Sequence, residues 1–123
     1  MSEEKKKRFT KRSLPASVRL AVEASLGKKA EDLCVLDLRE LSSFTDFFLV
    51  MHGNSSRQNA AVAEAIEAAL KPAGLRPLSV EGRESADWVL LDYGSIVVHV
   101  FSRAAREHYA LEKLWGDAPR LDF

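Results

Sequence analysis

The stretch of residues 86–101 constrains the fold more than any other part of this sequence. It contains two apolar runs, 88–91 and 96–101, joined by four residues that include Gly94. Branched and aromatic side chains favour a pleated, packed surface, and Gly94 supplies the positive φ that a tight turn requires. Both runs are apolar on both faces, so we expect a hairpin in the middle of a sheet, covered on each side.

The other elements follow from hydrophobic periodicity and from capping residues. Strands are expected at 33–38, 47–51 and 75–80. Helices are expected to start at caps formed by Ser13, Ser55 and Ser102, and the last helix is expected to run unbroken to about Leu114. Ser55 and Gln58 have the spacing of a capping box. The order of elements predicts an α/β (α+β) fold, with a single mixed five-stranded sheet flanked by helices.

Length and charge limit the classes of protein to be considered. A chain of 123 residues with zero formal net charge predicts one globular domain without a general attraction to nucleic acid or anionic lipid. We expect a disordered basic N-terminal tail at 1–12, the domain at 13–119 and a C-terminal tail at 120–123. The tail is expected to be a solvated terminus, with weak contact to rRNA phosphate as the alternative. The sequence shows no membrane segment and no signal peptide, so we expect a cytoplasmic protein.

The sequence offers few residues for catalysis. Its single cysteine, Cys34, lies in an apolar run, and its histidines lack the paired spacing of zinc sites, so no metal or other cofactor is expected. Asp87 and Asp92 flank a strand of about 17 Å, which is too long for them to share a metal ion. We therefore expect no enzyme. The alternative is a nucleotide-binding or nucleotidyltransferase-like enzyme that uses the helix N-terminus at residues 53–57.

Large amphipathic side chains instead predict an interaction surface. Trp88, Tyr93, Tyr109 and Trp115 lie near the ends of predicted elements, and such residues dominate interface hot spots. Trp88 follows a charged residue at the start of a strand, which makes it the best candidate for an exposed anchor. His99 lies among apolar residues and needs a hydrogen-bond partner if it is buried.

Six runs of the sequence are distinctive when they occur together. They are 45–48 (TDFF), 53–58 (GNSSRQ), 80–82 (VEG), 86–94 (ADWVLLDYG), 97–101 (VVHVF) and 109–115 (YALEKLW). In this order they resemble the ribosomal silencing factor family, RsfS, also called Iojap or YbeB, and the resemblance covers about residues 14–119. The resemblance implies a nucleotidyltransferase-like core without catalytic carboxylates, and homodimers are frequent in the family.

The family resemblance also implies a function. It implies a translational repressor that binds protein uL14 of the large ribosomal subunit and blocks joining of the small subunit, notably under nutrient limitation. Carried over by position, the family motifs predict seven partner-binding residues: Asp87, Trp88, Tyr93, Tyr109, Leu111, Glu112 and Lys113. The expected mechanism is steric, because the domain would occupy the place of the small subunit without any turnover.

Overall fold

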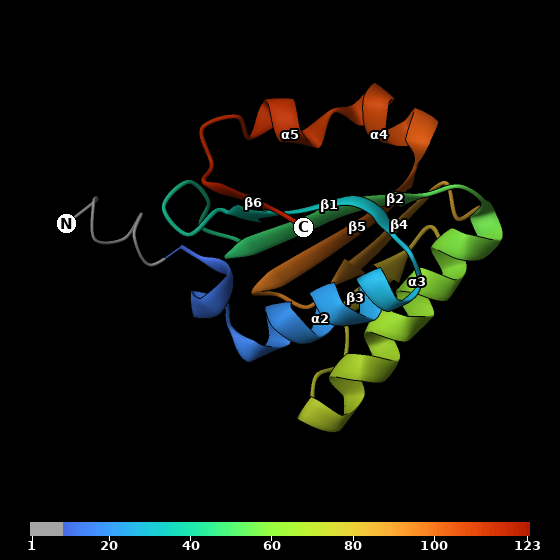
Figure 1. Ribbon diagram of the computed structural model, residues 1–123, viewed down its shortest axis with the longest axis horizontal. Coiled ribbons are helices and arrows are strands. Elements are labelled where there is room, and N and C mark those ends of the chain that lie inside the picture. The colour runs from blue at the N-terminus through green and yellow to red at the C-terminus, as the bar shows by residue number, and fades with distance from the viewer. Residues whose placement is uncertain (1–8) are drawn as a thin grey trace.

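The computed structural model describes residues 9–123 as one mixed sheet with helices on both of its faces (Figure 1). The strand order is β3-β4-β5-β2-β1-β6. β2 and β5 are parallel, and every other neighbouring pair is antiparallel. The strands are β1 (Glu31–Asp37), β2 (Phe47–Gly53), β3 (Ser79–Glu81), β4 (Trp88–Asp92), β5 (Ile96–Ser102) and β6 (Arg120–Asp122). The mixed-sheet prediction is confirmed.

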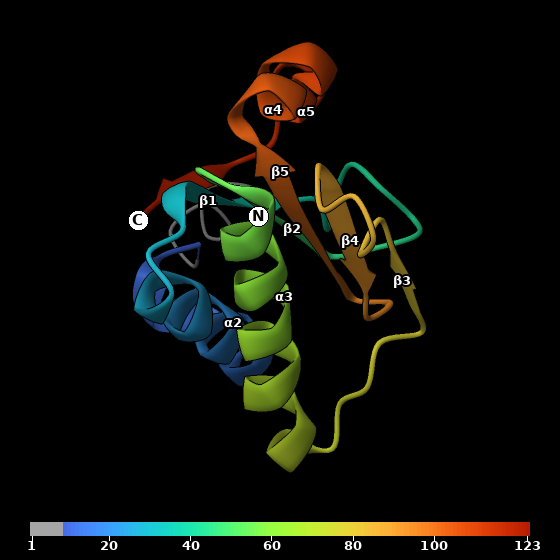
Figure 2. The same ribbon diagram turned by 90° about the vertical axis from the view of Figure 1, so that its right-hand side faces the viewer.

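The helices divide into two groups that lie on opposite faces of the sheet. They are the 3-10 turns η1 (Lys11–Ser13) and η2 (Lys71–Ala73) and the α-helices α2 (Ala16–Gly27), α3 (Ser56–Leu70), α4 (Arg103–Tyr109) and α5 (Leu111–Leu114). Figure 2 shows α2 and α3 on one side of the sheet and α4 and α5 on the other. The α2–α3 side contains the larger apolar cluster, and the α4–α5 side contains a smaller one.

The hairpin predicted within residues 86–101 is present, and β5 begins at Ile96 as expected. β4 and β5 pair from Trp88↔Phe101 to Asp92↔Val97, and Gly94 in the turn has a φ of 86°. Six of the seven residues of β5 are buried, which agrees with a central strand covered on both sides. β4 differs from the prediction, because its side chains alternate between buried and half-buried. One face of β4 is therefore only partly covered.

The strand count is six, so the predicted number of five is wrong. Arg120–Asp122, predicted as a C-terminal tail, pairs with β1 through Cys34↔Asp122, Val35↔Leu121 and Leu36↔Arg120. Three residues with a single inward apolar side chain carry no detectable alternation in sequence. The strand forms because the outer edge of β1 offers unpaired backbone groups that need hydrogen-bond partners.

The N-terminal boundary of the domain also differs from the prediction. Phe9 is buried and its ring stacks on Phe47 at 6.3 Å, although it was assigned to the tail. Ser13 is not the cap of the first helix, because it closes the short turn η1 with Thr10, and α2 follows Pro15. Residues 1–8, the remainder of the predicted basic tail, lie outside the described residues.

The last predicted helix is divided into two. Ser102 caps α4 as expected, since its Oγ accepts a hydrogen bond from the N–H of Ala105 at 3.0 Å. Ala110 then adopts a left-handed conformation, with φ 47° and ψ 49°, and α5 begins at Leu111. In one unbroken helix, Ala104, His108, Leu111 and Trp115 would form a single row, and the break separates them. Leu111 and Trp115 pack on the sheet, whereas Ala104 and His108 are exposed.

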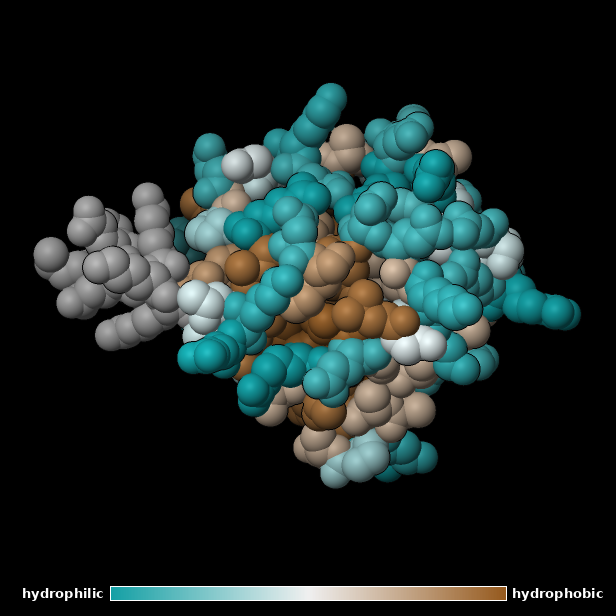
Figure 3. Space-filling model, in the orientation of Figure 1, coloured by the Kyte–Doolittle hydropathy of each residue, from teal (hydrophilic) through white to brown (hydrophobic). Residues whose placement is uncertain are grey.

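Part of the larger core reaches the surface. Figure 3 shows an apolar strip in the region between α2 and β6. Four half-buried residues of these two elements and the C-terminus pack against the larger cluster: Leu20, Ala24, Leu121 and Phe123. Leu121 of the sixth strand therefore covers part of the larger cluster on this side.

Gly82 fixes the start of β4 and yields a prediction for stability. It has a φ of 82°, and a Cβ built on it would clash with the backbone carbonyl of Trp88. We expect Gly82→Ala to lower the free energy of unfolding by at least about 2 kcal/mol, because left-handed backbone and overpacking both oppose the substitution. Chemical denaturation measures this change.

Gly27→Ala is the matched control for Gly82→Ala. A Cβ at Gly27 meets nothing within 4 Å, and Gly27 is the last residue of α2. We expect the free energy of unfolding of the Gly27→Ala variant to lie within about 1 kcal/mol of the value for the parent protein, or above it. Equal losses in the two variants would contradict the role assigned to Gly82.

Candidate functional site

An aromatic cluster occupies the half-covered face of the sheet beside α4. We call Phe48, Trp88, His99, Phe101 and Tyr109 the aromatic cluster. The indole of Trp88 is its centre, with ring centroids 4.9 Å from Phe101, 4.4 Å from Tyr109 and 5.9 Å from His99. His99 and Phe101 lie two residues apart on β5, so their side chains point to the same face of the sheet. Trp88 on β4 pairs with Phe101, and Phe48 on β2 pairs with Val97, so both point to this face as well. The strand register thus builds the site.

Trp88 is half-buried within this cluster, so the expectation of an exposed anchor is wrong. Its Nε1–H donates a hydrogen bond to Nδ1 of His99 at 3.1 Å. The prediction that His99 needs a partner is thereby confirmed. An indole nitrogen only donates, so Nδ1 of His99 is the acceptor and Nε2 carries the proton. Burial lowers the pKa of His99 from 6.5 to about 4.

Tyr109 and the residues of α5 form the rim of the aromatic cluster. Tyr109 is 49% exposed while it contacts Trp88, and Leu114 is 73% exposed. Leu111 and Trp115 pack on the smaller apolar cluster, where Trp115 meets Phe48 edge-on at 6.0 Å. An apolar surface with partly exposed aromatics can bind another protein.

The structure brings five of the seven predicted site residues to this side of the molecule: Trp88, Tyr109, Leu111, Glu112 and Lys113. Asp87 is exposed just before β4, and Lys113 is exposed on α5. Glu112 is engaged in an ion pair with Arg106, at 2.6 Å. Tyr93 lies elsewhere, because it packs against the larger cluster on the opposite face. Its hydroxyl is buried without a hydrogen-bond partner among the described residues, and burial raises the pKa of Tyr93 to about 12.

The sequence analysis missed Arg106, which is 9% exposed in α4. Its guanidinium donates to Glu112 and to Nδ1 of His52, and it lies 4.0 Å from Sγ of Cys34. Burial raises the pKa of Cys34 to about 11, which keeps the thiol protonated and unreactive. No local spacing pairs residues 106 and 112 in sequence, so the contact was not predictable from periodicity.

Backbone N–H groups at the helix N-terminus near residues 53–57 are already bound by side chains of the protein itself. Oγ of Ser55 accepts from the N–H of Gln58 at 3.0 Å, and Oε1 of Gln58 accepts from the N–H of Asn54 at 2.7 Å. The bond between Ser55 and Gln58 confirms one half of the predicted capping box, and the reciprocal bond comes from the N–H of Asn54 instead of Ser55. The side chain of Asn54 donates to the carboxylate of Glu31. A negative charge at this position opposes the binding of a nucleotide phosphate.

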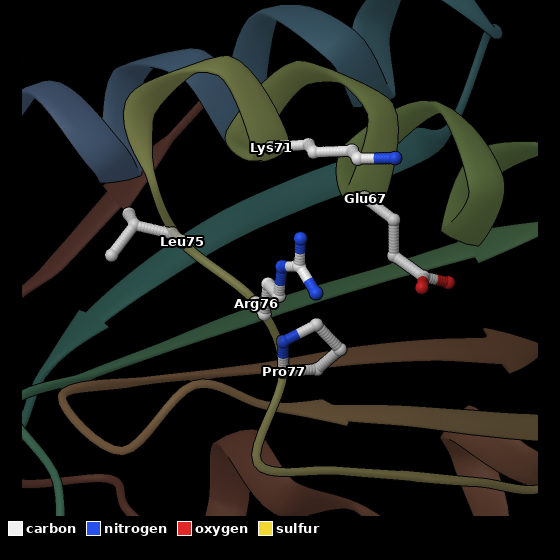
Figure 4. Close-up of a pocket in the computed structure, with 5 residues that line it drawn as sticks. All are labelled: Glu67, Lys71, Leu75, Arg76 and Pro77. Carbon is white, nitrogen blue, oxygen red and sulfur yellow. The ribbon is translucent and has the colours of Figure 1, made fainter.

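A separate surface pocket of about 360 Å³ lies at the C-terminal end of α3 (Figure 4). It is lined by Glu67, Lys71, Leu75, Arg76 and Pro77, and the guanidinium of Arg76 points toward α3. None of the seven predicted site residues lines this pocket. Within residues 9–123, no helix is long and apolar enough to cross a membrane.

The fold and the site define a small mixed-sheet protein with an aromatic face suited to protein binding, and comparisons with known proteins identify its family. The model of the family described as ribosomal silencing factor during starvation matches residues 11–123. A ribosomal silencing factor of Halalkalibacterium halodurans is 45% identical over 105 residues, which are 85% of this chain and 90% of that protein. This chain therefore belongs to the ribosomal silencing factor family, which confirms the resemblance seen in the sequence.

Two further comparisons support the fold and a connection with the ribosome. A crystal structure of a protein from Chromobacterium violaceum matches with a TM-score of 0.79 and 41% identity over 81% of this chain and 83% of that chain. A mouse protein named mitochondrial assembly of ribosomal large subunit protein 1 is 33% identical over 91 residues, which are 72% of this chain and 40% of the mouse protein. The family assignment gives the chain a ribosome-related role.

Burial of His99 predicts a pH dependence of stability. The unfolded chain binds a proton at His99 below about pH 6.5, whereas the folded pKa is about 4. The unfolded state then binds more protons within this window, so stability falls as pH decreases from 6.5 to 4, by an amount on the order of 3 kcal/mol. Denaturation at several pH values measures the loss, and an NMR titration of the ring assigns it to His99.

His108→Asn provides the control for this titration, because His108 is exposed on α4. We expect this variant to keep the pH dependence of the parent protein. Titration of His99 near pH 6.5 in the folded protein would contradict its assignment as a buried neutral imidazole.

Proposed function

We propose that this protein represses translation by binding uL14 on the large ribosomal subunit and excluding the small subunit. The observation that carries the proposal is the aromatic cluster with its exposed rim on a partly covered face of the sheet. Tyr109 and Leu114 are exposed there although both are large and apolar or amphipathic. The resemblance to the family implies that two runs, 86–94 and 109–115, supply the surface that faces uL14.

The physical properties of this face favour a tight complex. Trp88 is held by ring contacts and by its bond to His99, so little side-chain entropy is lost when a partner covers it. Asp87 is exposed beside it. An acidic group next to aromatic anchors favours a basic partner, which speeds encounter, while burial of the aromatics slows dissociation.

The proposed mechanism is steric and requires no turnover. The sheet carries helices on both of its faces (Figure 1), and the mechanism requires only that this packed domain docks as one body. A bound body at the subunit interface excludes a second particle by overlap alone. We place this activity in the cytoplasm. Contact of the basic tail with rRNA and a homodimer stay predictions of the sequence analysis.

Tyr109→Ala tests the docking face with little disturbance of the core, because Tyr109 lies half outside the aromatic cluster. We expect the dissociation constant for purified large subunits to rise by a factor of about 5–30, which corresponds to a hot-spot loss of about 1–2 kcal/mol. Sedimentation of the protein with large subunits over a range of concentrations measures this constant. The same shift is expected with isolated uL14.

Leu26→Ala is the matched control, since Leu26 is 43% exposed but belongs to α2 on the other face. Its dissociation constant should equal that of the parent protein. If Leu26→Ala weakens binding and Tyr109→Ala does not, the docking face has been assigned to the wrong side of the sheet.

A further inference from the structure

The guanidinium of Arg106 joins two helices to two strands. From α4 it donates through Nε and Nη2 to Oε1 of Glu112 in α5, at 2.9 and 2.6 Å. Nη1 donates to Nδ1 of His52 in β2 at 3.0 Å and approaches the carbonyl of Glu31 in β1 at 3.4 Å. The side chains of Arg106 and Glu112 are 10% and 20% exposed, so water screens their ion pair little.

This ion pair exists only because the helix is broken at Ala110. In a continuous α-helix, the side chains of two residues six positions apart point about 120° away from each other and lie about 9 Å apart along the axis. Arg106 and Glu112 could not form a direct ion pair in that geometry. The left-handed conformation of Ala110 turns α5 so that Glu112 faces Arg106.

The local sequence favours the opposite arrangement. Residues 103–114 are rich in Ala, Leu, Glu, Lys and Arg, all strong helix formers. A left-handed conformation is unfavourable for a residue with a Cβ, and Ala110 has one. The break therefore needs tertiary contacts to hold it, and the described contacts are the ion pair and the packing of Leu111 and Trp115 on the sheet.

The break also shapes the docking face. It directs Leu111 and Trp115 onto the smaller apolar cluster, next to the contact between Tyr109 and Trp88. We propose that the Arg106–Glu112 ion pair is a clamp that holds the break between α4 and α5, and that Glu112 is a positioning residue for the docking face rather than a contact to the partner. The clamp is argued from the structure alone, and only its expected effect on ribosome binding rests on the proposed function.

Glu112→Gln tests the clamp because it removes the charge and keeps the size of the side chain. We expect the dissociation constant for large subunits to rise about tenfold. Adding Ala110→Gly should restore most of the affinity, because glycine adopts the left-handed conformation without penalty and disfavours the straight helix. Ala110→Gly alone should bind as tightly as the parent protein or more tightly.

A measurement without ribosomes tests the conformation directly. A residue with positive φ gives a strong NOE between its own amide and Hα protons. We expect this NOE at Ala110 in the parent protein and its loss in Glu112→Gln. Absence of ribosome binding by the parent protein would refute the proposed function and leave this NOE experiment as an independent test of the clamp.

Glu107→Gln is the matched control, because it removes the same charge from an exposed position of α4. Its affinity and its NOE at Ala110 should equal those of the parent protein. Three results would overturn the inference: a Glu112→Gln variant that binds normally, an equal loss in both variants, or a loss that Ala110→Gly does not restore while the NOE persists. The last result would identify Glu112 as a direct contact.

Discussion

The structure depends on the burial of β5 between two layers of helices. A strand covered on both faces must be apolar along its whole length, and β5 departs from this rule at His99 alone among its central residues. Trp88 satisfies one ring nitrogen of His99, since its indole donates to Nδ1, whereas the buried Nε2 has no hydrogen-bond partner among residues 9–123. This bond fixes the indole at the middle of the aromatic cluster. One requirement of the core therefore also organises the face that we assign to the partner.

The two faces of the sheet perform different tasks. The long helices α2 and α3 cover one face and bury most of the apolar residues there (Figure 2). The short helices α4 and α5 cover the other face in part, so aromatic side chains reach the surface beside them. The proposed steric mechanism needs a well-packed domain and a face that binds the partner. The unequal coverage of the two faces is suited to both needs.

The sequence predicted the elements with strong periodicity and missed those that depend on tertiary contacts. The central hairpin and the caps at Ser55 and Ser102 were predictable because each rests on local pattern. The strand β6 was missed because three residues carry no period. The break at Ala110 was missed because local propensity favours a straight helix there. Arg106 was missed because its partners are distant in sequence or lie beyond that break.

The candidate site was predicted in part for the same reason. Trp88, Tyr109 and Leu111 lie on one face of the sheet, whereas Tyr93 lies on the other face and Glu112 pairs within the chain.

The proposed function is tested most directly by mixing purified small and large subunits with saturating amounts of this protein and measuring joined ribosomes on a sucrose gradient. The account predicts that the joined fraction falls strongly, with the protein sedimenting on free large subunits. An undiminished joined fraction at saturation would contradict it.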